Sequence, residues 1–187
     1  MRTLQPEIER AVALVNLGDP TATSMAAVLE SWGEHDVVLG PEDVAAIVAV
    51  LGDLRALFAT IDRDAAADRL NDLLAAHAGP PRLVRHEGWT WHLHLDRADD
   101  APWHEWLASS AALALATRLV AADGGVPWGI CAADGCAAAF VHDGRGGARR
   151  WCSTTCASRE RVRRHRAVLR NRPDRAGSEG QNAVSGR

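Results

Sequence analysis

The four cysteines lie within 26 residues, and their spacing is typical of a metal site. Cys131, Cys136, Cys152 and Cys156 follow the pattern Cys-x4-Cys-x15-Cys-x3-Cys. Two short pairs separated by an insert suit tetrahedral Zn²⁺, because each pair can present two thiolates at about 2.3 Å from one ion. Four thiolates leave no open coordination position, so the pattern predicts one structural Zn²⁺ and no hydrolysis at this site.

Disulfide bonds are the alternative use of these cysteines. They form in oxidising compartments, which secreted proteins reach through an apolar signal segment. Residues 1–18 contain Glu7 and Glu9 and no apolar run of the usual length. We therefore expect reduced thiols that bind zinc.

An arginine-rich segment follows the second cysteine pair, and we expect it to be helical from Ser153 to about Arg172. Val162, His165 and Leu169 form one face of this helix, which we expect to pack on the zinc site. Four arginines at intervals of three and four residues form a stripe beside that face, and two more precede Trp151. The predicted DNA contacts are Arg149, Arg150, Arg159, Arg163, Arg166 and Arg170.

Charge divides the chain at the same place. Residues 1–130 contain 9 Arg and 19 acidic residues, whereas residues 131–187 contain 12 Arg and 5 acidic residues. A basic module of this kind favours phosphate-rich partners, and DNA is the expected one. In the alternative, the arginines bind the acidic segment of the same chain or of a second copy.

The residues around the second cysteine pair resemble a known family. Arg149-Arg150-Trp151-Cys152-Ser153 and Cys156-Ala157-Ser158-Arg159 resemble the CGNR zinc finger, with Ala157 and Ser158 in place of the family's Gly and Asn. Upstream segments resemble the ABATE-type domain that accompanies this finger, namely Val15-Asn16, Leu70-Asn71 with Pro81–Val84, and Trp91–Leu95. The resemblance implies a bacterial transcriptional regulator.

The rest of the chain must position this module, and its apolar spacing predicts mainly helices. Pro6 and Pro41 suit first helical turns, and Gly18 and Gly33 suit helix ends. A β-hairpin around His86-Glu87-Gly88 is expected between the fourth and fifth helices. The expected helices are Pro6–Leu17, Thr23 or Ser24 to Trp32, Pro41–Phe58, Asp62–His77 and Pro102–Ala122, and the expected strands are Arg82–Arg85 and Trp89–Leu95.

The second strand of this hairpin alternates between two kinds of side chain. Trp89, Trp91, Leu93 and Leu95 share one face, which we expect to be buried, and His92 and His94 share the polar face. A pair of histidines on one strand occurs in metal sites, which makes a metal-dependent hydrolase a third hypothesis. In a further interpretation Trp89, Trp91, Trp103 and Trp106 line a ligand pocket with the histidines at its rim.

Together these patterns predict an α+β protein. A mainly helical N-terminal domain with a small antiparallel hairpin sheet covers 1–125, a zinc finger with its terminal basic helix covers 126–172, and a disordered tail covers 173–187.

We expect a DNA-binding transcriptional regulator whose N-terminal domain receives a small ligand or a protein partner. The alternative is a protein-interaction module with structural zinc and no DNA binding. We do not expect an enzyme. No apolar run approaches the ~20 residues of a membrane span, so a cytoplasmic protein without membrane contact is predicted.

Overall fold

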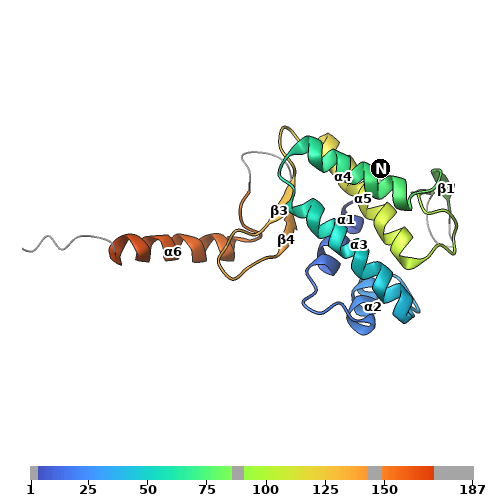
Figure 1. Cartoon of the computed structure of the whole chain (residues 1–187), viewed down its shortest axis with the longest axis horizontal. Coiled ribbons are helices and arrows are strands. Elements are labelled where there is room, and N and C mark those ends of the chain that lie inside the picture. Colours follow the sequence, from blue (N-terminus) through green and yellow to red (C-terminus); the bar gives the residue numbers. More distant parts are fainter. Residues whose placement is uncertain (1–3, 86–90, 143–148, 171–187) are drawn as a thin grey trace, which may run out of the picture.

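The computed structural model describes residues 4–85, 91–142 and 149–170, and it has the predicted α+β class. Five helices and a short hairpin form a body, from which a second hairpin leads to a sixth helix (Figure 1). The predicted tail at 173–187 lies outside the described residues. The elements are α1 Gln5–Val15, α2 Ala22–Ser31, α3 Pro41–Ala59, α4 Arg63–His77, β1 Arg82–Val84, β2 His92–His94, α5 Trp103–Ala121, β3 Trp128–Ile130, β4 Ala139–Val141 and α6 Thr154–Arg170.

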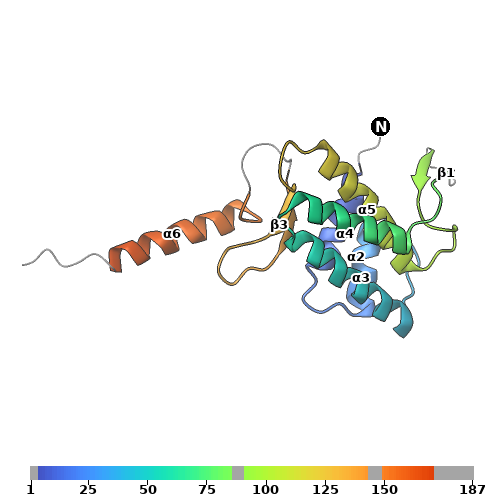
Figure 2. The ribbon, with the colours of Figure 1, turned by 45° about the horizontal axis from the view of Figure 1, so that its top comes forward.

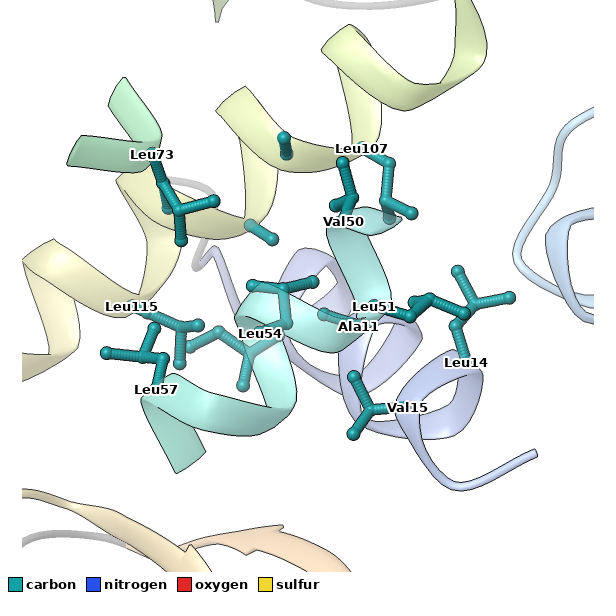
Figure 3. Close-up of a cluster of buried hydrophobic side chains, with 14 of the residues drawn as sticks. Ala11, Leu14, Val15, Val50, Leu51, Leu54, Leu57, Leu73, Leu107 and Leu115 are labelled. Atoms are coloured by element: carbon teal, nitrogen blue, oxygen red, sulfur yellow. The ribbon is translucent and has the colours of Figure 1, made fainter. Parts of the chain in front are cut away.

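The helical body is built around α5, which contacts α1, α3 and α4. Figure 3 shows leucines and valines of α1, α3 and α5 meeting at its centre. Leu54, Leu57 and Leu115 are fully buried there, and such burial contributes about 1.5–3 kcal/mol for each side chain. None of the helices in the described part of the chain is long and apolar enough to span a bilayer.

The helix starts follow the expected capping chemistry, with one shift. The Thr21 Oγ1 atom accepts the backbone N–H of Ser24 at 3.2 Å, so Thr21 is the cap of α2 in place of the predicted Thr23 or Ser24. Asp62 caps α4 by accepting the N–H of Ala65 at 2.9 Å. Because caps satisfy otherwise unpaired N–H groups, these residues determine where each helix begins.

The first hairpin forms as predicted, but the side chains of its second strand face the opposite way. β1 and β2 pair antiparallel with Leu83 opposite Leu93, and the predicted turn and Trp89 lie outside the described residues. The prediction that Trp91 and Leu93 are buried is wrong, because their side chains face solvent and Trp91 is 64 % exposed. His92 and His94 instead face the helices, where Asp96 is buried, with its carboxylate 2.7 Å from Arg82 and 3.1 Å from His94.

This reversal makes Trp91 a poor contributor to stability. We expect Trp91→Ala to change the free energy of unfolding by less than about 0.5 kcal/mol, because the Trp91 side chain buries little apolar area when the chain folds. Urea denaturation followed by circular dichroism measures the change. A loss of about 3 kcal/mol or more would show that the side chain is covered in solution.

The second hairpin, β3 with β4, was not predicted from the sequence, and it joins the metal module to the body. Trp128 of β3 is buried in the main core, where its indole N–H donates to the Leu57 carbonyl at 3.1 Å. The side-chain amide of Asn16 pairs with the backbone of Ala139, accepting its N–H at 2.7 Å and donating to its carbonyl at 2.9 Å. The hairpin is therefore held to α1 and α3 by apolar packing and by hydrogen bonds.

The segment at the predicted domain boundary, residues 124–127, is also tied to the body. Arg63 of α4 donates to the carbonyls of Leu119 at 2.6 Å and Gly125 at 3.3 Å, and Pro127 is fully buried. A guanidinium that satisfies several carbonyls at a helix end holds the following backbone in place.

α6 extends away from the body beyond the second hairpin (Figures 1 and 2). Only Cys156 and Glu160 of this helix are buried. The predicted packing of Val162, His165 and Leu169 on the zinc site is wrong, because all three side chains are exposed. The first turns of α6 already cover the small cysteine cluster, so the later turns extend past it.

Candidate metal centre

The four cysteine sulfurs converge on one point. Their Sγ atoms all lie within 4.8 Å of one another, with 3.9 Å between Cys136 and Cys152 and 3.6 Å between Cys152 and Cys156. A tetrahedron with Zn–S bonds of about 2.3 Å has sulfur–sulfur edges of roughly 3.8 Å. None of the four forms a disulfide. The donor set and its spacing therefore fit one zinc ion.

The first cysteine pair sits on a turn that extends the second hairpin. The N–H of Cys131 donates to the Ala138 carbonyl at 2.8 Å, and the N–H of Cys136 donates back to Ala133 at 2.9 Å. Gly135, just before Cys136, has a φ of +68°, a left-handed conformation that glycine adopts without steric cost. This turn brings the thiol of Cys136 toward that of Cys131.

The second pair sits at the start of α6. Ser153 lies before the first turn, and its hydroxyl accepts the N–H of Cys156 at 3.2 Å, in the manner of a helix cap. Cys152 and Cys156 thus lie near the positive end of the helix dipole, which stabilises thiolates. Ser153 of the predicted motif therefore caps the helix that carries Cys156.

The environment of the sulfurs favours a bound cation. Burial raises the pKa of Cys131, but the backbone N–H of Cys152, 3.4 Å from its sulfur, and further hydrogen bonds lower that pKa to about 7. Burial and the neighbouring sulfurs raise the pKa of Cys152 to about 12. Without a cation the four thiols cannot all ionise together, and a divalent ion removes that repulsion.

A small apolar cluster separate from the main core surrounds the sulfurs. Phe140 and Ala133 are buried in it with Cys131 and Cys156, and Trp151 packs against it. Gly129 makes room for the ring of Phe140, since a Cβ at this position would lie 3.1 Å from Cζ. This packing limits the access of water to the thiolates.

Two side chains that follow Cys156 fasten α6 to the first cysteine pair. Glu160 accepts the N–H of Asp134 at 3.0 Å, and Arg159 donates to the carbonyl of Asp134 at 2.9 Å. Hydrogen bonds from Arg163 and from the Asp134 N–H lower the pKa of Glu160, so this buried carboxylate stays ionised. Glu160 was not predicted as a functional residue, although a lone acid among arginines one turn after Cys156 could have indicated its role.

The arginines predicted to contact DNA differ in how many contacts they make within the protein itself. Arg149 donates to the carbonyls of Trp151 at 2.9 Å and Cys152 at 3.1 Å, and Arg150 lies over the Trp151 ring. Arg159 and Arg163 hold the contacts with Asp134 and Glu160. Within residues 4–85, 91–142 and 149–170, the side chains of Arg166 and Arg170 make no hydrogen bond or ion pair, and both residues are exposed.

Among the described residues, His92 and His94 are not part of a group of ligands that could hold a metal ion. In the described part of the chain, the four cysteines are the only group of three or more potential ligands that converge within 4.8 Å. The Nε2 atoms of His92 and His94 are 2.9 Å apart, and Nδ1 of His94 faces Asp96 at 3.1 Å. His142 accepts hydrogen bonds from Arg118 through its backbone carbonyl and is not part of the cysteine group.

Comparison with known proteins agrees with this geometry. Residues 128–168 match the family model of the CGNR zinc finger, which covers β3, the four cysteines and most of α6. No curated protein matches the chain. The match and the convergence of the four sulfurs support a CGNR-type zinc finger that holds one structural zinc ion.

Proposed function

We propose that the protein is a DNA-binding transcriptional regulator of the bacterial, cytoplasmic kind that the CGNR resemblance implies. In this proposal residues 126–172 bind DNA through α6, and an ABATE-type domain at 1–125 receives a signal. Zinc holds the finger together, and the protein acts by binding, not as an enzyme. A saturated tetrathiolate site suits this role because it has no position for a substrate.

The observation that supports DNA binding best is the exposure of α6. Six arginines lie on this helix, and after Glu160 only Ala167 is even partly buried among the described residues. The 17 residues of α6 form a rod roughly 25 Å long that stands clear of the body (Figure 2). A major groove about 12 Å wide admits a helix of this kind, and arginine binds both phosphates and guanine edges.

Arg166 and Arg170 are the most direct test of this surface. We expect their joint replacement by alanine to weaken binding to all duplex sequences by about tenfold or more at low salt. The slope of log K against log salt should become shallower by about 1.8, because two phosphate contacts are lost. Fluorescence anisotropy with a random duplex at several salt concentrations measures both quantities.

A matched control removes two arginines from the body. Arg69 and Arg85 are exposed on α4 and next to β1, so Arg69→Ala with Arg85→Ala changes the net charge equally without altering α6. This control should bind as the unmodified protein does. Equal loss in both double variants would indicate a nonspecific charge effect, and no loss in either would exclude α6 as the DNA contact.

A protein partner is the second candidate, favoured by apolar side chains on the same helix. Val168 and Leu169 are exposed to 68 % and 53 %, and Val162, six residues after Cys156, is exposed to 49 %. Helices with such residues can dock into an apolar groove of a partner. In the anisotropy assay, Val162→Gln with Leu169→Gln should leave DNA binding unchanged if α6 uses its arginines.

A further inference from the structure

A pocket of about 330 Å³ lies in the helical body, far in sequence from the metal centre. It is lined by the start of α1, the segment after α2, strand β2 and the middle of α5. Its volume is at the lower end of the range of small-molecule sites, which is roughly 300–1,000 Å³. Trp32 and Trp106 contribute aromatic surface to its walls.

Arg10 is a buried cation in this pocket with most of its hydrogen-bonding capacity unused. The residue is only 6 % exposed, and its guanidinium stacks 3.9 Å from the centre of the Trp106 ring. Nη2 donates to the Ser110 hydroxyl at 3.2 Å, Nη1 lies 3.7 Å from Glu34, and Nε has no hydrogen-bond partner among the described residues. A guanidinium has five N–H donors, so this one can donate hydrogen bonds to a further anionic oxygen.

Glu7, about one helical turn before Arg10, has a hydrogen-bond acceptor without a partner. It lines the same pocket, and its Oε2 atom is buried with no hydrogen-bond partner among the described residues. A carboxylate only accepts hydrogen bonds, and leaving a buried one unsatisfied is unfavourable. Rotation of the carboxyl group about its last torsion, which is soft, turns either oxygen toward the pocket.

The two residues therefore offer an unmet donor and an unmet acceptor on the same turn of α1. Glu34 adds a second carboxylate beside Arg10, so a simple anion would be repelled from this wall. A ligand with a carboxylate for Arg10 and an ammonium for Glu7 and Glu34 matches the charges and the unpartnered polar atoms of this wall. His92 and His94 already bond to each other and to Asp96, and they shape the wall of β2.

We propose that this pocket binds a small zwitterion of the α-amino acid type. The ammonium group pairs with Glu7, the carboxylate pairs with Arg10, and the side chain occupies the space beside Trp32. This ligand would be the signal that the N-terminal domain receives in the proposed function. The inference rests on the proposed function only in assuming that ligand binding regulates DNA binding. Binding is measured without DNA, so its failure and the failure of DNA binding are distinguishable.

The test uses the full zinc-loaded protein and the twenty proteinogenic L-amino acids, each at about 10 mM, because a ligand that binds only the folded state raises Tm. We expect at least one to raise Tm and to change tryptophan fluorescence, since Trp106 and Trp32 line the pocket. The same compound without its amino group, or without its carboxylate, should bind at least about tenfold more weakly. If no amino acid shifts Tm, or if these analogues bind equally well, the proposal is wrong.

Glu7→Gln provides the residue-level test, because it removes the charge and keeps the shape. Its affinity for the identified amino acid should fall about tenfold or more. Glu9→Gln is the matched control, since Glu9 is exposed on the same helix and bonds to Gln5 at 2.8 Å. Unchanged circular dichroism shows that Glu7→Gln is folded, and unchanged affinity in that variant would overturn the assignment. If Glu7→Gln does not fold, Arg10→Lys is measured in the same way, because it keeps the charge and loses the forked donors.

Discussion

Cys152→Ser is expected to abolish stoichiometric zinc binding and to unfold the finger. The sulfur of Cys152 lies within 3.9 Å of those of both Cys136 and Cys156, so its loss removes one corner of the tetrahedron of thiolates. Zinc contributes about 10–16 kcal/mol of apparent binding energy in zinc fingers, and much of that energy is folding energy. Metal analysis of the purified protein should show about one zinc per chain in the unmodified protein and far less in the variant.

The body should survive this change in a weakened form. Helices α1 to α5 retain their own core, whereas the second hairpin loses the metal that organises its far end. Far-ultraviolet circular dichroism should therefore show the loss of α6 and retention of the other helices. Thr155→Ser is a suitable control, because Thr155 is exposed beside the site and is no ligand. Full zinc content in Cys152→Ser, or none in the unmodified protein, would contradict a four-cysteine site.

Trp128→Ala is expected to have the largest effect of any single core substitution on the body. Trp128 is 3 % exposed, meets Phe58 edge to face and donates its indole N–H to Leu57. Truncation of a buried tryptophan costs about 3–5 kcal/mol in free energy of unfolding, because it removes apolar packing and leaves a cavity. Urea denaturation measures this loss.

Trp91→Ala is the matched control for this prediction, since it makes the same chemical change at an exposed site. Zinc affinity gives a second readout, because Trp128 begins the hairpin that carries Cys131. We expect Trp128→Ala to lower zinc affinity as well as stability. Equal stability of the two alanine variants would show that the second hairpin does not pack on the body in solution.

Residue types and short-range spacing predicted much of this architecture. Prolines, glycines and periodic apolar residues located the five helices of the body within a few residues, and the cysteine spacing indicated the zinc ligands before their geometry was known. These features depend on local chemistry, which a single sequence expresses directly. The predictions that need information on what a face packs against were less successful.

The first hairpin illustrates this limit. Alternation along residues 91–95 defined two faces, but it could not tell which face meets the body. The usual rule places apolar residues inside, and here His92 and His94 are inside because Asp96 and Arg82 supply polar partners there. The burial of Arg10 could not be predicted for the same reason, since it depends on Trp106 and Ser110, about a hundred positions away in the chain.

The second hairpin could not be predicted because its strands have three residues each and β3 contains a glycine. Short segments of this kind give no usable periodicity. The two strands are stabilised by pairing with each other and by partners such as Asn16, and a short stretch of sequence reveals neither contact. The role of Glu160 likewise depends on Asp134, which lies 26 positions earlier in the chain, between the first two cysteines.

The pairing of Asn16 with Ala139 has a consequence for biosynthesis. The contact spans 123 positions, so α1 cannot complete it until Ala139 has left the ribosome. At roughly 5–20 residues per second that delay is about 6–25 s. α1 packs on α5 as well as on α2 and α3, so part of its apolar face stays uncovered until α5 has been synthesised. Although α1 is synthesised before α2 to α6, it therefore reaches its complete native environment only after β4 has been made.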